Sequence, residues 1–301
     1  MKLILNIKLK KPALFGAYLA VFGVLVLTPD TMVMRFSNLD RWPLMAWRGV
    51  LMGVTLLILW WIFLTEKPWL EWKSLISIPG LVVIFAFAIN SITFTLGVQE
   101  TSVMVVLTAL ATMPVFAAIL SSFLMQEKQG IIGWLTITAA MTGVAIVVFD
   151  GNNATGGPTD GSTILGAIYG GITALGLALT FTLARKFPNL GVVPAAAIGS
   201  LVSGVIGFLM STPEDLFIAP IWTLLTMGII ILPISFACLS IAPRYTSSAV
   251  VSLIMLLELV IGPFWVWLGV GERPTFLMFL GAVFVLLVIS FHITRTQLHQ
   301  K

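Results

Sequence analysis

Three ionisable residues lie inside stretches of the sequence that are otherwise apolar: Asp30, Arg48 and Glu258. A charged side chain inside a membrane span costs a few kcal/mol, so each of these residues is a functional candidate by default. Glu258 lies about eleven residues into its apolar run, or ~16 Å along a helix, which is near the middle of a bilayer core. Its carboxyl group could take up a proton or bind a cationic group of a solute. The alternative is a structural carboxyl group that is hydrogen-bonded between helices.

Arg48, Asp30 and Asn90 fall at similar depths in the first three apolar runs. We therefore expect these three side chains to meet at one level of the membrane. In one interpretation, Arg48 holds the carboxylate or phosphate of a substrate and Asp30 orients it. In the other, the two charges form an internal ion pair, or Arg48 extends to the outer lipid headgroups.

Two tryptophans lie close in sequence to these candidates, because Trp47 precedes Arg48 and Trp265 follows Glu258 by seven residues. Their rings could form the wall of a site for a planar or cationic solute. Anchoring in the lipid is the alternative role for Trp265.

Prolines fall within several of the apolar runs, and three of them are candidates for hinges or kinks: Pro29, Pro114 and Pro263. Proline removes one helical hydrogen bond and frees a carbonyl group, which can line a cavity in a membrane protein. A kink that neighbouring helices accommodate by packing is the alternative for each of them.

The composition places all of these residues in a membrane protein. The chain has 301 residues, of which 59% are hydrophobic and 9% charged, and its mean hydropathy is +1.08. Soluble domains carry ~25% charged residues, so a soluble fold is excluded, and so is disorder. Helices that span a bilayer core need about 20 apolar residues. Ten runs approach or exceed this length, at residues 12–29, 49–65, 74–99, 101–126, 129–149, 161–184, 187–213, 216–243, 245–271 and 274–294. The first two runs extend to about residue 34 and back to about residue 43 when Asp30 and Arg48 are counted inside the membrane, and Glu258 interrupts the run 245–271.

The predicted fold class is therefore an all-α membrane protein with ten transmembrane helices, since spanning β-strands would be shorter and alternating. With the N-terminus inside, twelve Lys and Arg residues fall on the cytoplasmic side, three outside and one in a span. This bias follows the positive-inside rule. We expect an integral protein of a bacterial inner membrane with both termini in the cytoplasm.

Other classes of function find little support in the sequence. Basic residues are scattered singly between apolar runs, which disfavours nucleic-acid binding. One cysteine, Cys238, and two histidines, His292 and His299, give no plausible metal site. No nucleotide-binding loop, Gly-x-Ser-x-Gly motif or His-Glu-x-x-His motif occurs. We therefore expect no enzyme activity, no cofactor and no direct drive by ATP.

Two sequence patterns recur in the two halves of the chain. Phe-x-Asn-Leu-x3-Pro occurs at 36–43 and again at 187–194, and the block from Thr101-Ser102 to Glu127 returns as Thr246-Ser247 to Glu272. Each half contains five predicted spans, so the second half enters the membrane from the opposite side. The expected domains are residues 12–149 (spans 1–5) and 161–294 (spans 6–10), related as an inverted repeat. Chance similarity between apolar segments is the alternative.

The same residues resemble the EamA domains of the drug/metabolite transporter superfamily. The resemblance rests on Thr-Ser openings, prolines within the helices that follow, and Glu-containing ends: Thr101-Ser102, Pro114, Gln126-Glu127-Lys128, Thr246-Ser247, Glu258, Gly262-Pro263 and Gly271-Glu272-Arg273-Pro274. It implies a ten-helix secondary carrier of small organic solutes, frequently an exporter, with a central cavity between the repeats. In the second half Glu258 and Pro263 are separated where Glu-Pro is often adjacent, which predicts a helix break displaced by about one turn.

The function that follows is secondary transport of a small organic metabolite, such as an amino acid or related solute, by alternating access. Export is the expected direction, the lipid bilayer is a partner, and protons are a candidate coupling ion. A solute channel or facilitator and a multidrug-type cation exporter are the alternatives.

Overall fold

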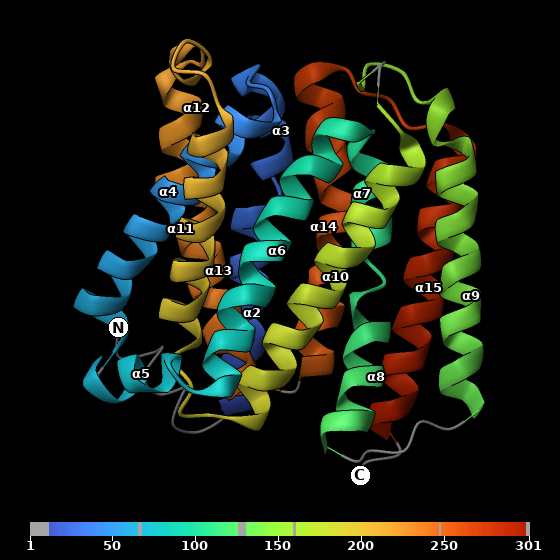
Figure 1. Cartoon of the computed structure of the whole chain (residues 1–301). Coiled ribbons are helices and arrows are strands. Elements are labelled where there is room, and N and C mark those ends of the chain that lie inside the picture. Colours follow the sequence, from blue (N-terminus) through green and yellow to red (C-terminus); the bar gives the residue numbers. More distant parts are fainter. Residues whose placement is uncertain (1–11, 66–67, 126–130, 159–160, 247, 299–301) are drawn as a thin grey trace.

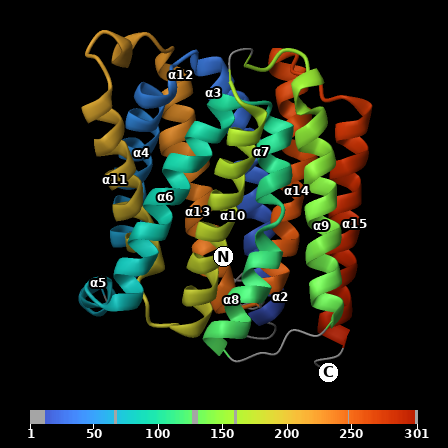
Figure 2. The same ribbon diagram turned by 45° about the vertical axis from the view of Figure 1, so that its right-hand side comes forward.

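The protein is a bundle of helices that run roughly parallel and antiparallel to one axis (Figures 1 and 2). The computed structural model describes residues 12–65, 68–125, 131–158, 161–246 and 248–298. Within these ranges the fold is all-helical and contains no strand, apart from a single antiparallel bridge between Thr155 and Arg273. The all-α prediction is confirmed.

The elements follow one another with short connections. The first half of the chain forms α2 (Pro12–Leu27), α3 (Asp30–Ser37), α4 (Arg41–Leu59), the π-helix η1 (Trp60–Leu64), α5 (Pro68–Leu75), α6 (Ile78–Glu100), α7 (Val103–Leu110), α8 (Met113–Met125) and α9 (Ile131–Asp150). The second half forms η2 (Gly151–Asn153), α10 (Thr163–Lys186), α11 (Val192–Met210), η3 (Asp215–Phe217), α12 (Ile221–Leu225), η4 (Thr226–Ile231), α13 (Leu232–Ile241), η5 (Ala242–Arg244), α14 (Ser248–Val270) and α15 (Phe276–Leu298).

Eight helical segments of the described chain are long and apolar enough to cross a membrane, counting broken helices as one segment: Pro12–Ser37, Arg41–Leu64, Ile78–Glu100, Val103–Leu124, Thr163–Lys186, Val192–Met210, Ile221–Arg244 and Val250–Val270. The fifth and tenth predicted spans fall on α9 and α15. Among the described residues the apolar stretches of these two helices are shorter, Thr138–Asp150 and Phe276–Val288. A helix satisfies its own backbone hydrogen bonds, which is why long apolar runs fold this way in lipid.

Two of these segments are interrupted in the middle of the bundle. The chain leaves the helical path at Thr28 and Pro29 between α2 and α3, and at Ala111 and Thr112 between α7 and α8. Both breaks lie at or just before a predicted proline, Pro29 and Pro114. The interruption expected near Pro263 does not occur, because α14 runs through this residue without a break. A helix that packs on its neighbours tolerates the loss of one backbone hydrogen bond without unwinding.

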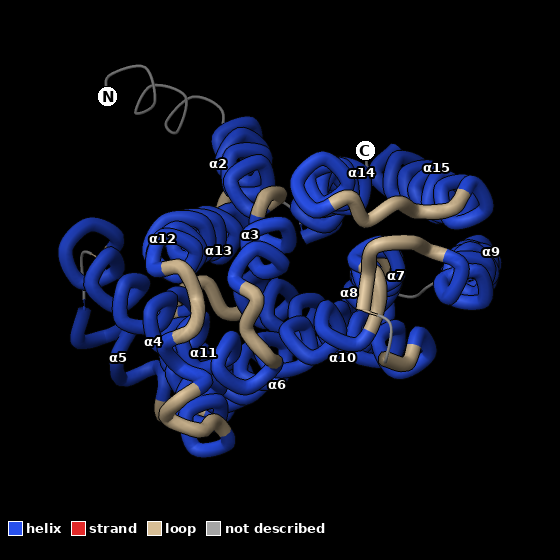
Figure 3. Tube along the Cα trace, turned by 90° about the horizontal axis from the view of Figure 1, so that it is seen from above, coloured by secondary structure: helices blue, strands red, loops and turns tan. Residues whose placement is uncertain are grey.

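The halves of the chain interlock rather than forming separate bodies. Helix α4 packs against α11, α6 against α10, α9 against α15 and α2 against α13, and the view along the bundle axis shows these partners side by side (Figure 3). The α4–α11 contact is the tightest of them. A methyl group on Gly49 would lie 2.5 Å from the backbone of Gly204, so the two helices meet backbone to backbone.

We expect Gly49→Val to lower the free energy of unfolding by about 1–3 kcal/mol or more, because the side chain would force α4 and α11 apart. Gly171→Val on α10 is the matched control, since a methyl group there meets no atom within 4 Å. Thermal unfolding of the purified variants in detergent measures the difference. Equal melting temperatures for the two variants would contradict the close α4–α11 contact.

Candidate functional site

A small cavity lies inside the bundle where both halves of the chain meet. Its volume is about 30 Å³, and its polar lining consists of Asp30, Arg48, Asn90, Ser91, Thr173 and Glu258. Four of these are the ionisable and amide residues singled out in the sequence, so the fold brings them together from α3, α4, α6 and α14. The volume suffices for one or two water molecules and is about tenfold below that of ordinary ligand pockets.

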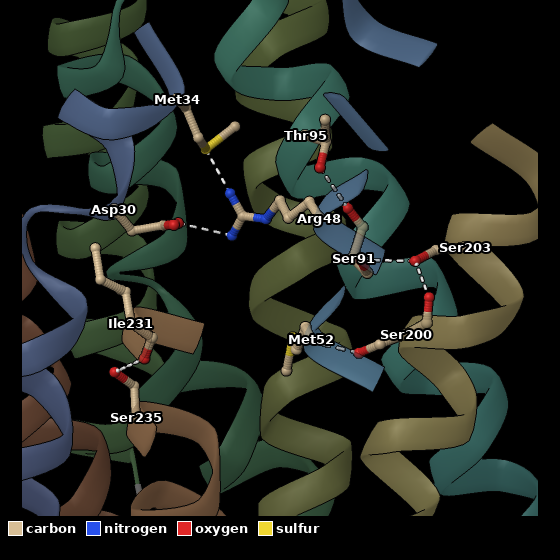
Figure 4. Close-up of polar contacts among 10 residues, drawn as sticks. All are labelled: Asp30, Met34, Arg48, Met52, Ser91, Thr95, Ser200, Ser203, Ile231 and Ser235. Atoms are coloured by element: carbon tan, nitrogen blue, oxygen red, sulfur yellow. Dashed lines mark hydrogen bonds and ion pairs between the residues drawn. The ribbon is translucent and has the colours of Figure 1, made fainter. Parts of the chain in front are cut away.

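Arg48 and Asp30 form a buried ion pair in this cavity, with 2.7 Å between Nη2 and Oδ2 (Figure 4). The other terminal nitrogen of Arg48 contacts the sulfur atom of Met34, and the guanidinium lies 5.1 Å from the centre of the Phe94 ring. The break in the first span explains the position of Asp30, which becomes the first residue of α3. A carboxylate is stabilised at such a helix N-terminus by the helix dipole.

Glu258 lines the same cavity from α14, and its side chain is 3% exposed. It also borders a second cavity of about 10 Å³, next to the break between α7 and α8. Its Oε2 atom has no hydrogen-bond partner among the described residues, and its charge interacts with those of Asp30 and Arg48. Two carboxylates thus face one guanidinium. A buried charge without a partner is costly, so this arrangement can accept one further proton or cation.

Asn90 on α6 lies at the same cavity with its side chain 4% exposed. Its neighbour Ser91 accepts a hydrogen bond of 2.8 Å from Ser203 of α11, as Figure 4 shows. Thr173 of α10 lies 2.8 Å from the hydroxyl group of Thr93. The hydroxyl lining from Ser91 and Thr173 was missed in the sequence. The signal for Ser91 was the series of hydroxyl residues at alternate positions after Asn90, namely Ser91, Thr93 and Thr95. Thr173 lies in a helix with no such signal.

The structure places Trp47 and Trp265 outside the cavity. The indole of Trp47 donates a hydrogen bond of 2.6 Å to the carbonyl of Leu216 and packs on Phe208 and Phe217. Consecutive residues of a helix point about 100° apart, so Trp47 and Arg48 face different neighbours. Phenylalanines supply the aromatic lining instead: Phe87, Phe94 and Phe236.

Trp265 instead contacts the break in the first span. Its indole donates a hydrogen bond of 3.2 Å to the hydroxyl group of Thr28, while the side chain is 37% exposed. That hydroxyl also donates to the carbonyl of Leu25. Because Pro29 has no N–H, this carbonyl lacks its normal helical donor. Trp265 and Thr28 therefore support the break that positions Asp30.

The prolines contribute through the backbone rather than through their rings. Pro114 deprives the carbonyl of Leu110 of its helical donor, and Leu110 lines both cavities. The second break thus brings a free carbonyl to the region of Glu258. Pro263 does not line the central cavity.

A second ion pair, largely buried, lies at the end of the bundle where α12 is found (top of Figure 1). There, Glu272 forms an ion pair of 3.2 Å with Arg35 and accepts a hydrogen bond from the backbone N–H of Val103. Arg35 also donates to the carbonyl of Thr101. Burial raises the pKa of Glu272, and Arg35 and the Val103 N–H act in the opposite direction. These contacts tie α3, α7 and the α14–α15 connection together. The corresponding residue of the first half, Glu127, lies outside the described residues.

The comparison with known proteins agrees with this architecture. Residues 31–149 match the model of the EamA-like transporter family. The match covers most of the first half of the chain, and the family is part of the drug/metabolite transporter superfamily. A solved structure entitled only "Crystal structure of protein" shares the fold, with a TM-score of 0.67 and 11% identity, over 96% of this chain and all of the other. No curated protein matches the sequence.

EamA proteins are transporters rather than enzymes, and the apolar helices agree with this class. The EamA match and the apolar helices together indicate an integral membrane transporter of the drug/metabolite transporter type, for which a small solute and the surrounding lipid are the implied partners.

Proposed function

We propose that this protein is a secondary transporter that moves a small organic solute by alternating access. The observation that carries the proposal is the cavity in which the Asp30–Arg48 ion pair faces Glu258 inside an otherwise apolar bundle. Intramembrane ionisable groups of this kind mark substrate and ion pathways. Inside the spans that the structure describes, no other cluster brings three ionisable side chains together.

Alternating access is based on ten spans in two inverted five-helix repeats, residues 12–149 and 161–294. The packing supports this symmetry. When each helix is exchanged for its counterpart in the other half, the α6–α10 contact becomes the α13–α2 contact. The α4–α11 and α9–α15 contacts are each formed between counterparts, so the exchange leaves them unchanged. Two repeats of opposite orientation provide two equivalent openings, one to each side of the membrane.

The orientation has both termini in the cytoplasm of a bacterial cell. Charges at the two ends of the bundle support it. Side chains at the α5 end (bottom of Figure 1) include Lys73, Arg185, Lys186 and Arg244 against Glu71, whereas acidic side chains outnumber basic ones at the α12 end. Basic residues favour the cytoplasmic side.

The solute class follows from the charges of the cavity. An amino acid or related zwitterion complements these charges, with its carboxylate at Arg48, its ammonium group at Glu258, and its apolar part against Phe87, Phe94 and Phe236. The volume of about 30 Å³ admits no such solute, so binding requires an opening of the bundle. The contacts of Glu272 with Arg35 and Val103 would break when the α12 end opens. Export is the direction that we propose.

A cation exporter of multidrug type is the second candidate, since two carboxylates outnumber the one guanidinium of the cavity. Antiport of a cation against a proton would keep the charge of the site constant. The transport assay separates this candidate from the first.

The experiment uses purified protein in liposomes, after a thermal-shift screen of amino acids, nucleosides and amphipathic cations. A solute at 100 times its dissociation constant should stabilise the protein by ~2.7 kcal/mol. We expect saturable uptake and exchange of the labelled solute, with zwitterions favouring the first candidate and cations the second. Flux without saturation would indicate a channel instead, and absence of both binding and flux would refute the proposal.

A further inference from the structure

A second, larger hollow lies on the outside of the bundle, away from the transport cavity. It has a volume of about 550 Å³ and lies between the end of α4 with η1 and the short helix α5. Figure 1 shows α4 leaning outward above α5 at this end of the bundle. Its lining is entirely apolar and includes Trp60, Trp61, Trp69 and Trp72. We call it the tryptophan groove.

The base of the groove is fixed by specific contacts. Trp60 is buried, and its indole donates a hydrogen bond of 2.6 Å to the Oε2 atom of Glu71. Its ring stacks on that of Trp72, with 6.1 Å between centroids and 30° between planes. The π-helical turn η1 begins at Trp60, and such turns are frequent at functional sites. The groove is therefore a built feature rather than a gap between loosely packed helices.

The walls of the groove remain open to the surroundings. The side chains of Trp61 and Trp69 are 65% and 71% exposed. Tryptophans of this kind are typical of the level where lipid chains meet headgroups. Next to them, the ammonium group of Lys73 lies 5.9 Å from the centre of the Trp69 ring.

Lys73 gives the groove a positive rim. No described residue forms an ion pair with its ammonium group. The nearby Glu71 is engaged instead by Trp60 and, at 4.0 Å, by Arg244. A positive charge beside an apolar groove at this depth complements a molecule with a phosphate head and a hydrocarbon tail.

We propose that the tryptophan groove binds one anionic phospholipid, with an acyl chain along Trp61, Trp69 and Trp72 and the phosphate at Lys73. The apolar lining favours the chain, and the ammonium group selects a headgroup with net negative charge. The site is separate from the transport cavity, so it stands independently of the transported solute.

Tryptophan fluorescence tests this assignment on the full-length protein in bilayers. Phosphatidylcholine vesicles receive increasing fractions of brominated phosphatidylglycerol or brominated phosphatidylcholine, whose bromine atoms quench nearby tryptophans. We expect phosphatidylglycerol to reach half-maximal quenching at about fivefold lower fraction, the factor that one basic residue contributes near an anionic surface. Double replacement Trp69→Leu/Trp72→Leu should remove most of the selective component.

Lysine variants distinguish a defined site from general attraction to the charged end of the bundle. Lys73→Gln should abolish the preference. Lys186→Gln, which removes an equivalent charge lying 5.7 Å from the Phe187 ring, should retain it. Equal quenching by both lipids in the unmodified protein would overturn the proposal, as would an equal loss of preference in the two lysine variants. Elution as a single monodisperse species verifies that each variant is folded.

Discussion

Replacement of Arg48 by methionine is expected to lower the free energy of unfolding by about 3–5 kcal/mol and to abolish transport. The reason is the burial of its partner. Asp30 is 1% exposed, and without Arg48 its carboxylate would remain in the bundle with no counter-charge. Chemical unfolding in detergent measures the stability, and uptake into liposomes measures the transport.

Two further variants decide whether the loss comes from the unpaired charge. Asp30→Asn/Arg48→Met removes both charges and should recover most of the stability, although not the transport. Arg41→Gln breaks an ion pair of 2.9 Å in which Arg41 is exposed, and the buried partner Glu100 keeps a hydrogen bond from the backbone N–H of Ser162, so this change should cost only about 1 kcal/mol. If Arg48→Met destabilises the protein no more than Arg41→Gln, the central pair is not an energetic requirement of the fold.

A conservative replacement of Arg48 tests whether its guanidinium group contacts the substrate. Arg48→Lys keeps the positive charge but loses the planar fork that binds a carboxylate through two hydrogen bonds. We expect this variant to weaken the binding of zwitterionic solutes more than that of cations. An equal effect on both classes would identify Arg48 as a structural lock.

Glu258→Gln is expected to abolish the stimulation of transport by a pH gradient while leaving the protein folded. Glutamine has nearly the same shape as glutamate but carries no exchangeable charge at this position. The cavity of this variant would hold one carboxylate and one guanidinium, which neutralise each other without a further proton. Uptake into liposomes with and without a pH gradient gives the ratio that measures coupling.

Glu272→Gln is the matched control for this experiment. Glu272 is buried to a similar degree, at 4% exposure, but it lies at the α12 end and is paired with Arg35. Its replacement should lower stability and leave the stimulation ratio unchanged. A stimulation ratio for Glu258→Gln equal to that of the unmodified protein would refute the coupling role.

The two halves of the chain differ in the continuity of their helices. The first and fourth spans are broken near Pro29 and Pro114, while the helices at the matching positions of the second half, α10 and α14, are continuous. Glu258 on the unbroken α14 faces the break between α7 and α8. Glu258 of the second half and Leu110 of the first half, whose carbonyl lacks its helical donor, therefore line the same cavities.

Proline alone did not predict this asymmetry. Pro114 and Pro263 both lie inside apolar runs, yet the chain unwinds only before Pro114. The sequence shows where a backbone hydrogen bond is lost. Whether the helix opens there depends on the residues that pack around it, such as Thr28 and Trp265 at the first break.

The sequence by itself determined the membrane environment, the helical class and the position of Asp30, Arg48 and Glu258 within apolar surroundings. These conclusions rest on the high cost of charge and unpaired backbone in lipid, which holds for any arrangement of the helices. Tertiary structure alone decided which side chains share the cavity. The spans are apolar on all sides, so the sequence gives no preferred face for each helix. Packing set those rotations, turning Arg48 inward and Trp47 away, and adding Phe94 and Thr173 to the site.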